Sequence, residues 1–142
     1  MEKEESFGVI PVRKKRGKYE VFLVKLVNGG HWGFPKGHRE NELESPKEIA
    51  KRELKEETNL EIKRFISDIS FNETYQLLRD NKKIEKIVIY FLIEVSGNFN
   101  LQKNEILDGG WFDINEAIEK ITFSGSQNIC KKVSIYLQKD GI

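Results

Sequence analysis

The chain has 142 residues, which is the length of one ordinary domain and too short for two. Charged residues make up 33% and hydrophobic residues 38%, a composition typical of a folded globular protein and not of a disordered one. The formal net charge of +1 provides no overall field that would favour DNA, an acidic partner or a membrane surface.

Cys130 is the only cysteine, which excludes an internal disulfide framework and a multi-cysteine zinc site. The opening stretch MEKEESFGVIPV lacks the basic and apolar segments of a secretory signal. The longest apolar run, Ile87 to Ile93, is too short to span a bilayer. We therefore expect a single domain over residues 1–142 in the cytoplasm, with no membrane partner.

The first predicted elements are two strands around a glycine turn. SFGVIPV and YEVFLVKLV are rich in β-formers, and KKRGK between them is more typical of a solvated turn than of a nucleic-acid contact. Alternation places Val21 and Leu23 on one face, continued by Lys25 or Val27. The pattern predicts a β-hairpin.

A loop and a helix come next. The stretch from Trp32 to Asn41 follows neither a strand nor a helix period, so we expect an ordered loop. SPKE then predicts a helix start, because the Ser45 side chain can accept from the Glu48 amide while the Glu48 side chain reaches back to Ser45. Asn59 tolerates a left-handed conformation and marks the expected helix end.

The rest of the chain alternates between strands and helices. KRFISDISF and EKIVIYFLIEV predict two strands joined by the polar turn RDNKK, and GGWFDI predicts another. INEAIEKI and SQNICKKVSIYLQK predict closing helices, the second from the spacing of Ile129, Val133 and Leu137. Without a regular strand-helix-strand repeat, this order indicates an α+β fold with a mixed sheet flanked by helices.

Three glutamates gather on one side of the predicted helix. Glu53, Glu56 and Glu57 stand at i, i+3 and i+4, and like charges at this spacing repel each other. A solvated helix face is the ordinary explanation, but Lys36 and Gly37 just upstream supply a point charge and a close backbone approach. Loop and helix together indicate a site for a metal ion and a diphosphate.

The segment from Gly37 to Leu60 resembles the signature of the Nudix hydrolases, with RELKEETNL as its second half and Glu44 seven residues before Arg52. Two positions depart from that signature. Six residues instead of five separate Gly37 from Glu44, which leaves Glu42 as an alternative, and Asn59 replaces a glycine. The resemblance implies an α/β/α sandwich around a mixed sheet, and hydrolysis of a phosphoanhydride in a nucleoside diphosphate linked to another group.

The resemblance also implies roles for single residues. Glu53 and Glu57 would be the principal ligands of Mg²⁺ or Mn²⁺, with Glu56 as a further ligand, or Glu53 would hold the attacking water as a base. Arg52 would orient Glu53, and Gly37 would offer its carbonyl oxygen to the metal. We expect the Glu57 carboxylate to be exposed.

The loop HWGFPKGH is similar to that of the asymmetric diadenosine tetraphosphate hydrolases, as is TYQLLRDNKKIEKIVIYFLIEV further on. This similarity implies adenine stacking, phosphate contacts and a glutamate near the metals. The implied residues are Tyr75, Phe123 and Tyr90 for the base, Lys36, His38, Lys83 and Lys86 for phosphate, and Glu105 among the catalytic groups. Each has an ordinary alternative: packing for the aromatic rings, edge-strand charges for the two later lysines, loop hydrogen bonds for His31 and His38, and a solvated loop for Glu105.

Three functions follow from these features. The first is a dinucleoside polyphosphate hydrolase that cuts diadenosine tetraphosphate to ATP and AMP, with a small nucleotide as its partner. The second is an RNA 5′-pyrophosphohydrolase, which the near-neutral charge disfavours because RNA contacts need local lysine and arginine. The third is a non-catalytic nucleotide-sensing module, which would tolerate loss of Glu53 or Glu57. The sequence leaves a monomer and a homodimer open.

Overall fold

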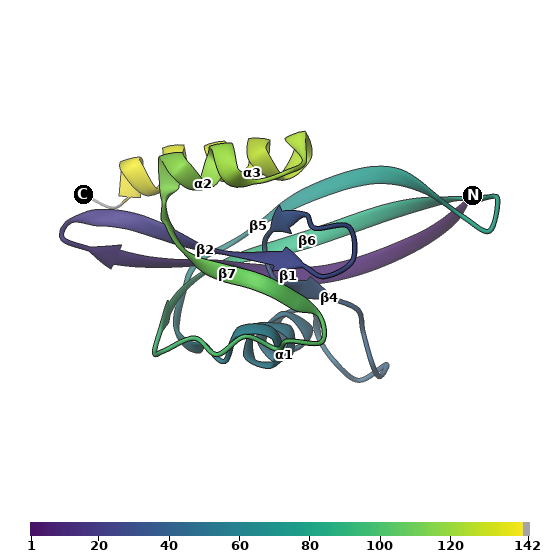
Figure 1. Ribbon diagram of the computed structural model, residues 1–142, viewed down its shortest axis with the longest axis horizontal. Helices are drawn as coiled ribbons and strands as arrows, with labels where there is room; N and C mark the ends of the chain where they lie inside the picture. The colour runs from purple at the N-terminus through teal and green to yellow at the C-terminus, as the bar shows by residue number, and fades with distance from the viewer. Residues whose placement is uncertain (141–142) are drawn as a thin grey trace.

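The computed structural model describes residues 1–140, apart from the side chains of Ser67 and Asp140. Within that range one sheet lies between α1 on one side and α2 with α3 on the other (Figure 1). The strands are β1 (Glu2–Lys15), β2 (Lys18–Leu26), β3 (Trp32–Gly33), β4 (Lys36–Gly37), β5 (Glu61–Arg79), β6 (Lys82–Ser96) and β7 (Ile106–Asp113). The helices are α1 (Pro46–Thr58), α2 (Ile114–Lys120) and α3 (Ser124–Asp140). The expected α/β/α sandwich is confirmed.

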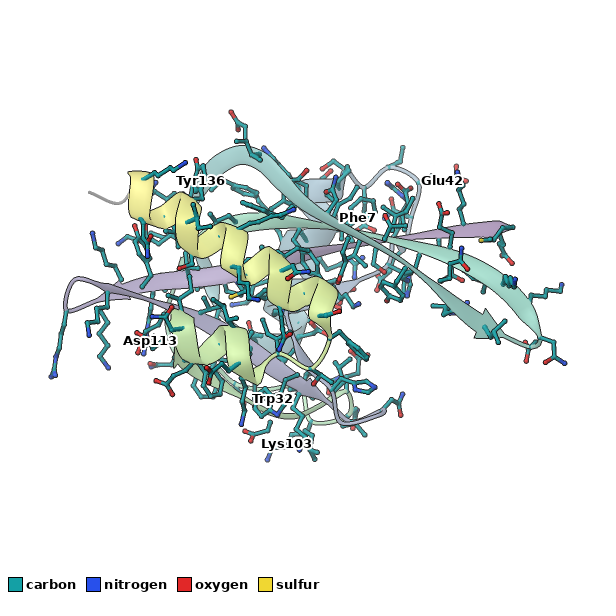
Figure 2. The ribbon with its side chains drawn as sticks, turned by 90° about the horizontal axis from the view of Figure 1, so that it is seen from above. Phe7, Trp32, Glu42, Lys103, Asp113 and Tyr136 are labelled. Carbon is teal, nitrogen blue, oxygen red and sulfur yellow. The ribbon has the colours of Figure 1, made fainter. Side chains whose placement is uncertain are left out.

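The sheet is mixed, as the sequence predicts. Its main order is β3-β2-β1-β6-β5, with β7 paired to β2 and β4 paired to β1. β1 runs parallel to β6, and the other pairs are antiparallel. The long β5–β6 hairpin and the first part of β1 extend beyond the helices, and Figure 2 shows α2 and α3 lying across the sheet without covering this end.

The edge of β1 changes partner along its length. Its later residues pair with β2, whereas Phe7 and Gly8 pair with Gly37 and Lys36 of β4. Between these pairings the Val9 amide donates to the Pro35 carbonyl oxygen at 3.0 Å. The predicted loop therefore contains two strands of two residues each, which are too short to show an alternating pattern in the sequence. This arrangement fixes Lys36 and Gly37 against the middle of the sheet.

Apolar side chains fill both faces of the sheet. Val21 and Leu23 pack in the cluster under α2 and α3, while Phe22 and Val24 pack in the cluster under α1. Val21 and Leu23 therefore share a face, as the alternation predicts. The opposite face is also buried, because a strand covered on both sides carries a continuous apolar run. Cys130 belongs to the first cluster, and burial raises the pKa of its thiol to about 12.

Helix α1 begins and ends where the sequence predicts. The Ser45 hydroxyl accepts from the Glu48 amide at 3.2 Å, and the Glu48 carboxylate accepts from the Ser45 amide at 2.9 Å. Pro46 occupies the start of the helix, where no amide hydrogen is needed. Asn59 has φ 64° and donates its amide to the Lys55 carbonyl oxygen, so it forms the left-handed cap.

The described residues include no helix with both the length and the apolar character required to cross a membrane.

Candidate active site

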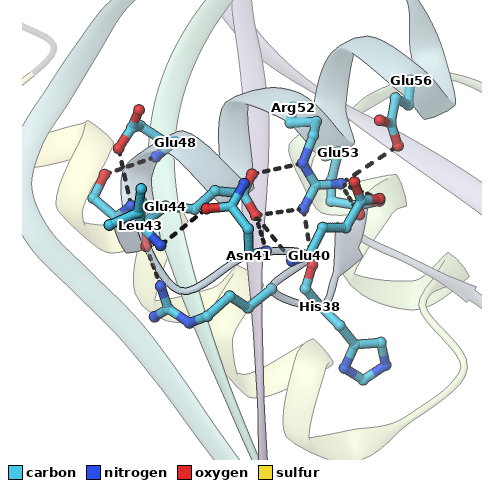
Figure 3. Close-up of polar contacts among 11 residues, drawn as sticks. His38, Glu40, Asn41, Leu43, Glu44, Glu48, Arg52, Glu53 and Glu56 are labelled. Atoms are coloured by element: carbon cyan, nitrogen blue, oxygen red, sulfur yellow. Dashed lines mark hydrogen bonds and ion pairs between the residues drawn. The ribbon is translucent and has the colours of Figure 1, made fainter.

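Arg52 is the centre of an ion-pair network between α1 and the loop before it (Figure 3). Its guanidinium donates to Glu44 at 2.8 Å and to Glu53 at 2.9 Å. It also donates to Glu40 at 3.0 Å and to the His38 carbonyl oxygen at 2.9 Å. Because a guanidinium presents several N–H groups in a fixed plane, this one side chain orients both the loop and the helix carboxylates.

The Arg52 network uses Glu44 and not Glu42. The Glu44 carboxylate also accepts from the amides of Glu40 and Asn41, at 2.9 and 3.3 Å. Hydrogen bonding to Arg52, followed by these amides, lowers the pKa of Glu44 to about 2. Glu42, by contrast, is exposed. Because Glu44 is the residue that contacts Arg52, the extra loop residue lies between Gly37 and Glu44, and the spacing from Glu44 to the helix is unchanged.

Glu53 extends from α1 toward β4. Its carboxylate lies so close to Gly37 that a Cβ on that residue would overlap it. Burial raises the pKa of Glu53, while the hydrogen bond from Arg52 acts in the opposite direction. Gly37, which the sequence predicts to allow a close approach to the backbone, therefore makes room for the Glu53 carboxylate.

Glu57 is buried, with 4% of its surface exposed, which contradicts the expectation of an exposed carboxylate. It lies on the face of α1 that packs against β4, where the Lys36 amide donates to it. Its Oε1 atom has no hydrogen-bond partner among the described residues. Burial, with Glu53 and Glu105 nearby, raises the pKa of Glu57 to about 8.

Carboxylate oxygens converge beside Arg52. One oxygen from each of Glu40, Glu53 and Glu56 lies within 4.8 Å of the other two. Arg52 is within ion-pair distance of all three, so one cation offsets three carboxylates, and the buried Oε1 of Glu57 has lost its hydration without gaining a partner among the described residues. An all-oxygen donor set of this kind fits a hard divalent cation such as Mg²⁺ or Mn²⁺.

A cavity of about 430 Å³ opens beside Glu40 and Glu53 of this cluster. Acidic side chains line part of its wall, and basic and aromatic side chains line another part. The lining residues are Ser6, Lys36, Gly37, His38, Glu40, Glu53, Tyr75, Leu77, Arg79, Lys86 and Glu105. The cavity is thus built to hold a molecule that carries both a cation and several anionic groups.

Glu105 reaches the cavity from the residue just before β7. Its charge raises the pKa of both Glu53 and Glu57. The Val27 amide donates to the Glu105 carbonyl oxygen at 2.9 Å, which anchors this end of the loop to β2. The side chain predicted among the catalytic groups therefore lies beside the helix carboxylates.

The basic wall contains three of the four residues predicted to contact phosphate. Lys36 lies beside Tyr75, with its ammonium 3.4 Å from the phenol oxygen, and burial lowers its pKa. Lys86 is buried, and its ammonium lies 3.5 Å from Nδ1 of His38. Burial, followed by the charge of Lys86, lowers the pKa of His38.

Lys83, the fourth predicted phosphate contact, does not line the cavity. It is exposed and pairs with Leu78 of β5, whereas Lys86 pairs with Tyr75. Side chains of a strand alternate between faces, so residues three apart point to opposite sides of the sheet. Lys83 and Lys86 therefore cannot serve the same cavity.

The three predicted base-binding aromatics have different environments. Tyr75 is 38% exposed in the main cavity, and Phe123 is 54% exposed with its ring 4.5 Å from that of His31. Tyr90 is only 1% exposed and packs edge-on against Phe34 in the core, and it forms part of the wall of the small cavity that also holds Phe123.

Phe123 belongs to a second, smaller cavity of about 50 Å³, whose walls also include His31 and Trp32. Lys36 lines both cavities, so they adjoin at this residue. Tyr75 and Phe123 thus flank Lys36 from different cavities, and no ring contact between them is found in the described residues.

The comparisons with known proteins agree with this geometry. Residues 2–130 match the family of the NUDIX domain. The chain belongs to the Nudix hydrolase family. A curated relative of this Nudix domain is the asymmetrical bis(5′-nucleosyl)-tetraphosphatase of Caenorhabditis elegans, 28% identical over 135 residues, which cover 94% of this chain and 96% of that protein. The protein 111R of Invertebrate iridescent virus 3, named as a hydrolase, is 39% identical over 100 residues, 69% of this chain.

The match to the viral protein spans about half of its length, 54%. Among solved structures, a binary complex of the C. elegans Ap4A hydrolase has a TM-score of 0.72 at 23% identity, covering 96% of this chain and 98% of that one. The NUDIX domain of Shewanella oneidensis NrtR with ADP ribose has a TM-score of 0.68 at 14% identity, covering 96% and 90%. These likenesses establish the fold.

Several residues that line the site of this Nudix domain were not predicted from the sequence. Glu40 lies in the loop, where no period points to it, and its contacts with Arg52 and the neighbouring carboxylates reveal it only in the structure. Ser6 and Arg79 lie on strands far apart in the chain. Arg79 had a signal, because it stands four residues after Tyr75 and therefore on the same face of β5.

Proposed function

We propose that this Nudix domain catalyses the metal-dependent hydrolysis of a phosphoanhydride bond in dinucleoside polyphosphates, cutting diadenosine tetraphosphate to ATP and AMP. The observation that carries the proposal is one cavity lined by the carboxylates of Glu40, Glu53 and Glu105 and by the cations Lys36, Lys86 and Arg79. The similarity to the C. elegans tetraphosphatase over nearly the whole chain supports the choice of substrate.

In this proposal the acidic wall holds one or more divalent cations through Glu53, Glu56, Glu57 and the Gly37 carbonyl oxygen, with Glu40 as an additional ligand. When bound, such a cation neutralises charge that develops on the reacting phosphate and makes a water molecule more acidic. Arg52 fixes the orientation of Glu53 through their 2.9 Å hydrogen bond. Either Glu53 or Glu105 would then orient the attacking water or accept its proton.

The basic wall would bind the polyphosphate. Lys36 and the buried Lys86 supply positive charge, and His38 adds a ring nitrogen beside Lys86. Tyr75 and Phe123 would each stack on a base, an interaction of about 1–3 kcal/mol per base if single-strand values apply. Because the two rings lie in different cavities, we assign them to separate contacts. Tyr90 lines the Phe123 cavity but is 1% exposed, so we assign it to the wall of that cavity and not to stacking on a base.

Two other functions are alternatives to the hydrolysis of dinucleoside polyphosphates. RNA 5′-pyrophosphohydrolysis would use the same carboxylates, with an RNA strand extending from the cavity. A sensing module would bind a nucleotide without turnover, and the ADP-ribose complex of the NrtR domain makes ADP-ribose the ligand to test. Retention of Glu53 and Glu57 favours hydrolysis. The cytoplasmic location and the oligomeric state, monomer or homodimer, stay predictions.

The test is a substrate panel assayed with Mg²⁺ and again with Mn²⁺. Diadenosine tetraphosphate, triphosphorylated RNA and ADP-ribose are incubated separately, and the products are identified by mass spectrometry. Turnover of the dinucleotide far above that of the other two is expected. Turnover of RNA alone would favour the second function, and binding of ADP-ribose without turnover of any substrate would favour the third.

A further inference from the structure

The outer end of the cavity is built by three neighbouring strands that extend past the helices (Figure 1). Glu4 of β1 pairs with Lys86 of β6, and Lys86 pairs with Tyr75 of β5, so these three side chains share one face. The two-residue period of a strand adds Ser6 and Arg79 to the same face.

One carboxylate neutralises two cations at this end. The Arg79 guanidinium donates to both oxygens of Glu4, at 3.4 Å for Oε1 and at a closer approach for Oε2. The Lys86 ammonium lies 3.5 Å from Oε1 of Glu4. Lys86 is only 5% exposed, so its charge requires a nearby anion, and Glu4 is the carboxylate that this structure places there.

Arg79 is the outermost cation in a chain of contacts that leads away from His38. Lys86 lies 3.5 Å from Nδ1 of His38 on its inner side and 3.5 Å from Glu4 on its outer side, and the Arg79 guanidinium lies beyond Glu4. Both Arg79 and Glu53 nevertheless line the same cavity. We expect a diphosphate held at the carboxylates to meet the inner groups Lys36 and His38, and a chain of several phosphates to extend past Lys86 to Arg79.

We propose that Arg79, Lys86 and Ser6 form an outer phosphate-binding position for the far end of a polyphosphate chain, and that Glu4 occupies this position in the free protein as an internal anion. The inference rests on the proposed function in taking a polyphosphate as the substrate. When a long phosphate chain binds, its oxygens replace the Glu4 carboxylate as the partners of Arg79 and Lys86, because they carry more charge and offer more acceptors. A short chain leaves the Glu4 pairs intact, so the position selects for chain length.

The test measures binding of inorganic polyphosphate, which requires no catalysis. Calorimetric titrations with tetrapolyphosphate and with pyrophosphate, at fixed Mg²⁺, are compared for the unmodified protein, Arg79→Gln and Glu4→Gln. Glu85→Gln is the matched control, because it also removes one negative charge from the β1–β6 pair but breaks the Lys3–Glu85 contact instead. Thermal melts establish that each variant is folded.

Arg79→Gln should weaken tetrapolyphosphate roughly tenfold or more, the effect of losing a charged hydrogen-bond partner, and leave pyrophosphate unchanged. Glu4→Gln should tighten tetrapolyphosphate about threefold or more, while Glu85→Gln changes neither ligand. Unchanged tetrapolyphosphate binding by Arg79→Gln would overturn the proposal. Weakened binding by Glu4→Gln would also overturn it, because Glu4 would then merely hold Arg79 in place.

This result is independent of the proposed reaction. If the protein fails to cut diadenosine tetraphosphate yet the variants change tetrapolyphosphate binding as expected, the outer position stands and the reaction is wrong. If the protein cuts the dinucleotide and the variants bind tetrapolyphosphate as the unmodified protein does, the reaction stands and the outer position is wrong.

Discussion

The carboxylate of Glu53 lies against the Cα atom of Gly37, with no room for a Cβ between them. Gly37→Ala should therefore displace Glu53 from the cation site. Because a misplaced ligand typically costs far more in turnover than in folding, we expect kcat for diadenosine tetraphosphate to fall roughly a hundredfold, with a melting temperature within a few degrees of the unmodified protein. Steady-state kinetics and thermal melts measure the two effects.

Gly110→Ala is the matched control for this substitution. A Cβ at Gly110 meets nothing within 4 Å, and this glycine lies on β7 away from the cavity. Its kinetics should match those of the unmodified protein. Equal turnover by Gly37→Ala and Gly110→Ala would contradict the idea that Glu53 depends on close contact with Gly37.

Glu57→Gln should abolish most turnover while leaving the fold intact. The change removes a proposed cation ligand, and we expect kcat to fall roughly a hundredfold or more. Stability without metal should stay the same or rise, because the substitution replaces a buried carboxylate that has an unpartnered oxygen. Kinetics with Mg²⁺ and melts with a chelator measure both. Near-normal turnover would refute the role of Glu57.

The raised pKa of Glu57 predicts a pH-dependent stability of the metal-free protein. Its carboxyl has a pKa of about 8 in the folded state against an ordinary value of 4.5, so the folded protein holds a proton that the unfolded chain releases. Stability from this group is therefore full below about pH 4.5, declines as the pH rises and is lost above about pH 8. Melts of the unmodified protein and Glu57→Gln across this window test the prediction, and the decline should be clearly smaller in the variant.

Cation binding should depend on pH in the opposite direction. A cation must displace the Glu57 proton, so Mg²⁺ affinity should rise with pH and level off above about pH 8. The gain in melting temperature from Mg²⁺ should accordingly be larger at about pH 8 than at about pH 6. A gain that does not change with pH would mean that Glu57 is not a ligand.

Arg52→Lys should impair both folding and catalysis. An ammonium cannot reproduce the planar contacts with Glu44, Glu53 and the His38 carbonyl oxygen, and we expect a loss of about 1–3 kcal/mol in the free energy of unfolding. Turnover should fall about 10- to 100-fold, the usual effect of losing a residue that orients ligands. Denaturant titrations and kinetics measure these losses.

Lys55→Gln serves as the control for Arg52→Lys. Lys55 also lies on α1 and pairs with Glu61, but both side chains are exposed and the pair lies outside the cavity. Its loss should change the free energy of unfolding by less than about 1 kcal/mol and leave turnover unaltered. If both substitutions destabilise the protein equally, the Arg52 network has no special role.

The helix that carries the site was predictable because its signals are local. Ser45, Glu48 and Asn59 form the caps that their residue types and spacing predict. The spacing of Glu53, Glu56 and Glu57 correctly placed them near one another, but it did not reveal that Glu57 is buried. Burial depends on β4 packing against this turn of α1, and a two-residue strand leaves no pattern in the sequence.

The basic wall of the cavity was predicted less well, because its residues were chosen from the family resemblance without regard to which face of the strand each one occupies. Lys83 and Lys86 were assigned together, although a three-residue spacing on one strand places them on opposite faces. Glu4 and Arg79 were missed because their contact joins residues 75 positions apart and depends on the parallel pairing of β1 with β6. Such pairings follow from the whole sheet and not from any short segment.

The most direct test of the account is the identity of the products formed from diadenosine tetraphosphate with Mg²⁺, in parallel for the unmodified protein and Glu57→Gln. We predict equal amounts of ATP and AMP from the unmodified protein and almost none from the variant, which also controls for a contaminating hydrolase. Two molecules of ADP, or equal product from both proteins, would contradict the proposed asymmetric reaction at the α1 carboxylates.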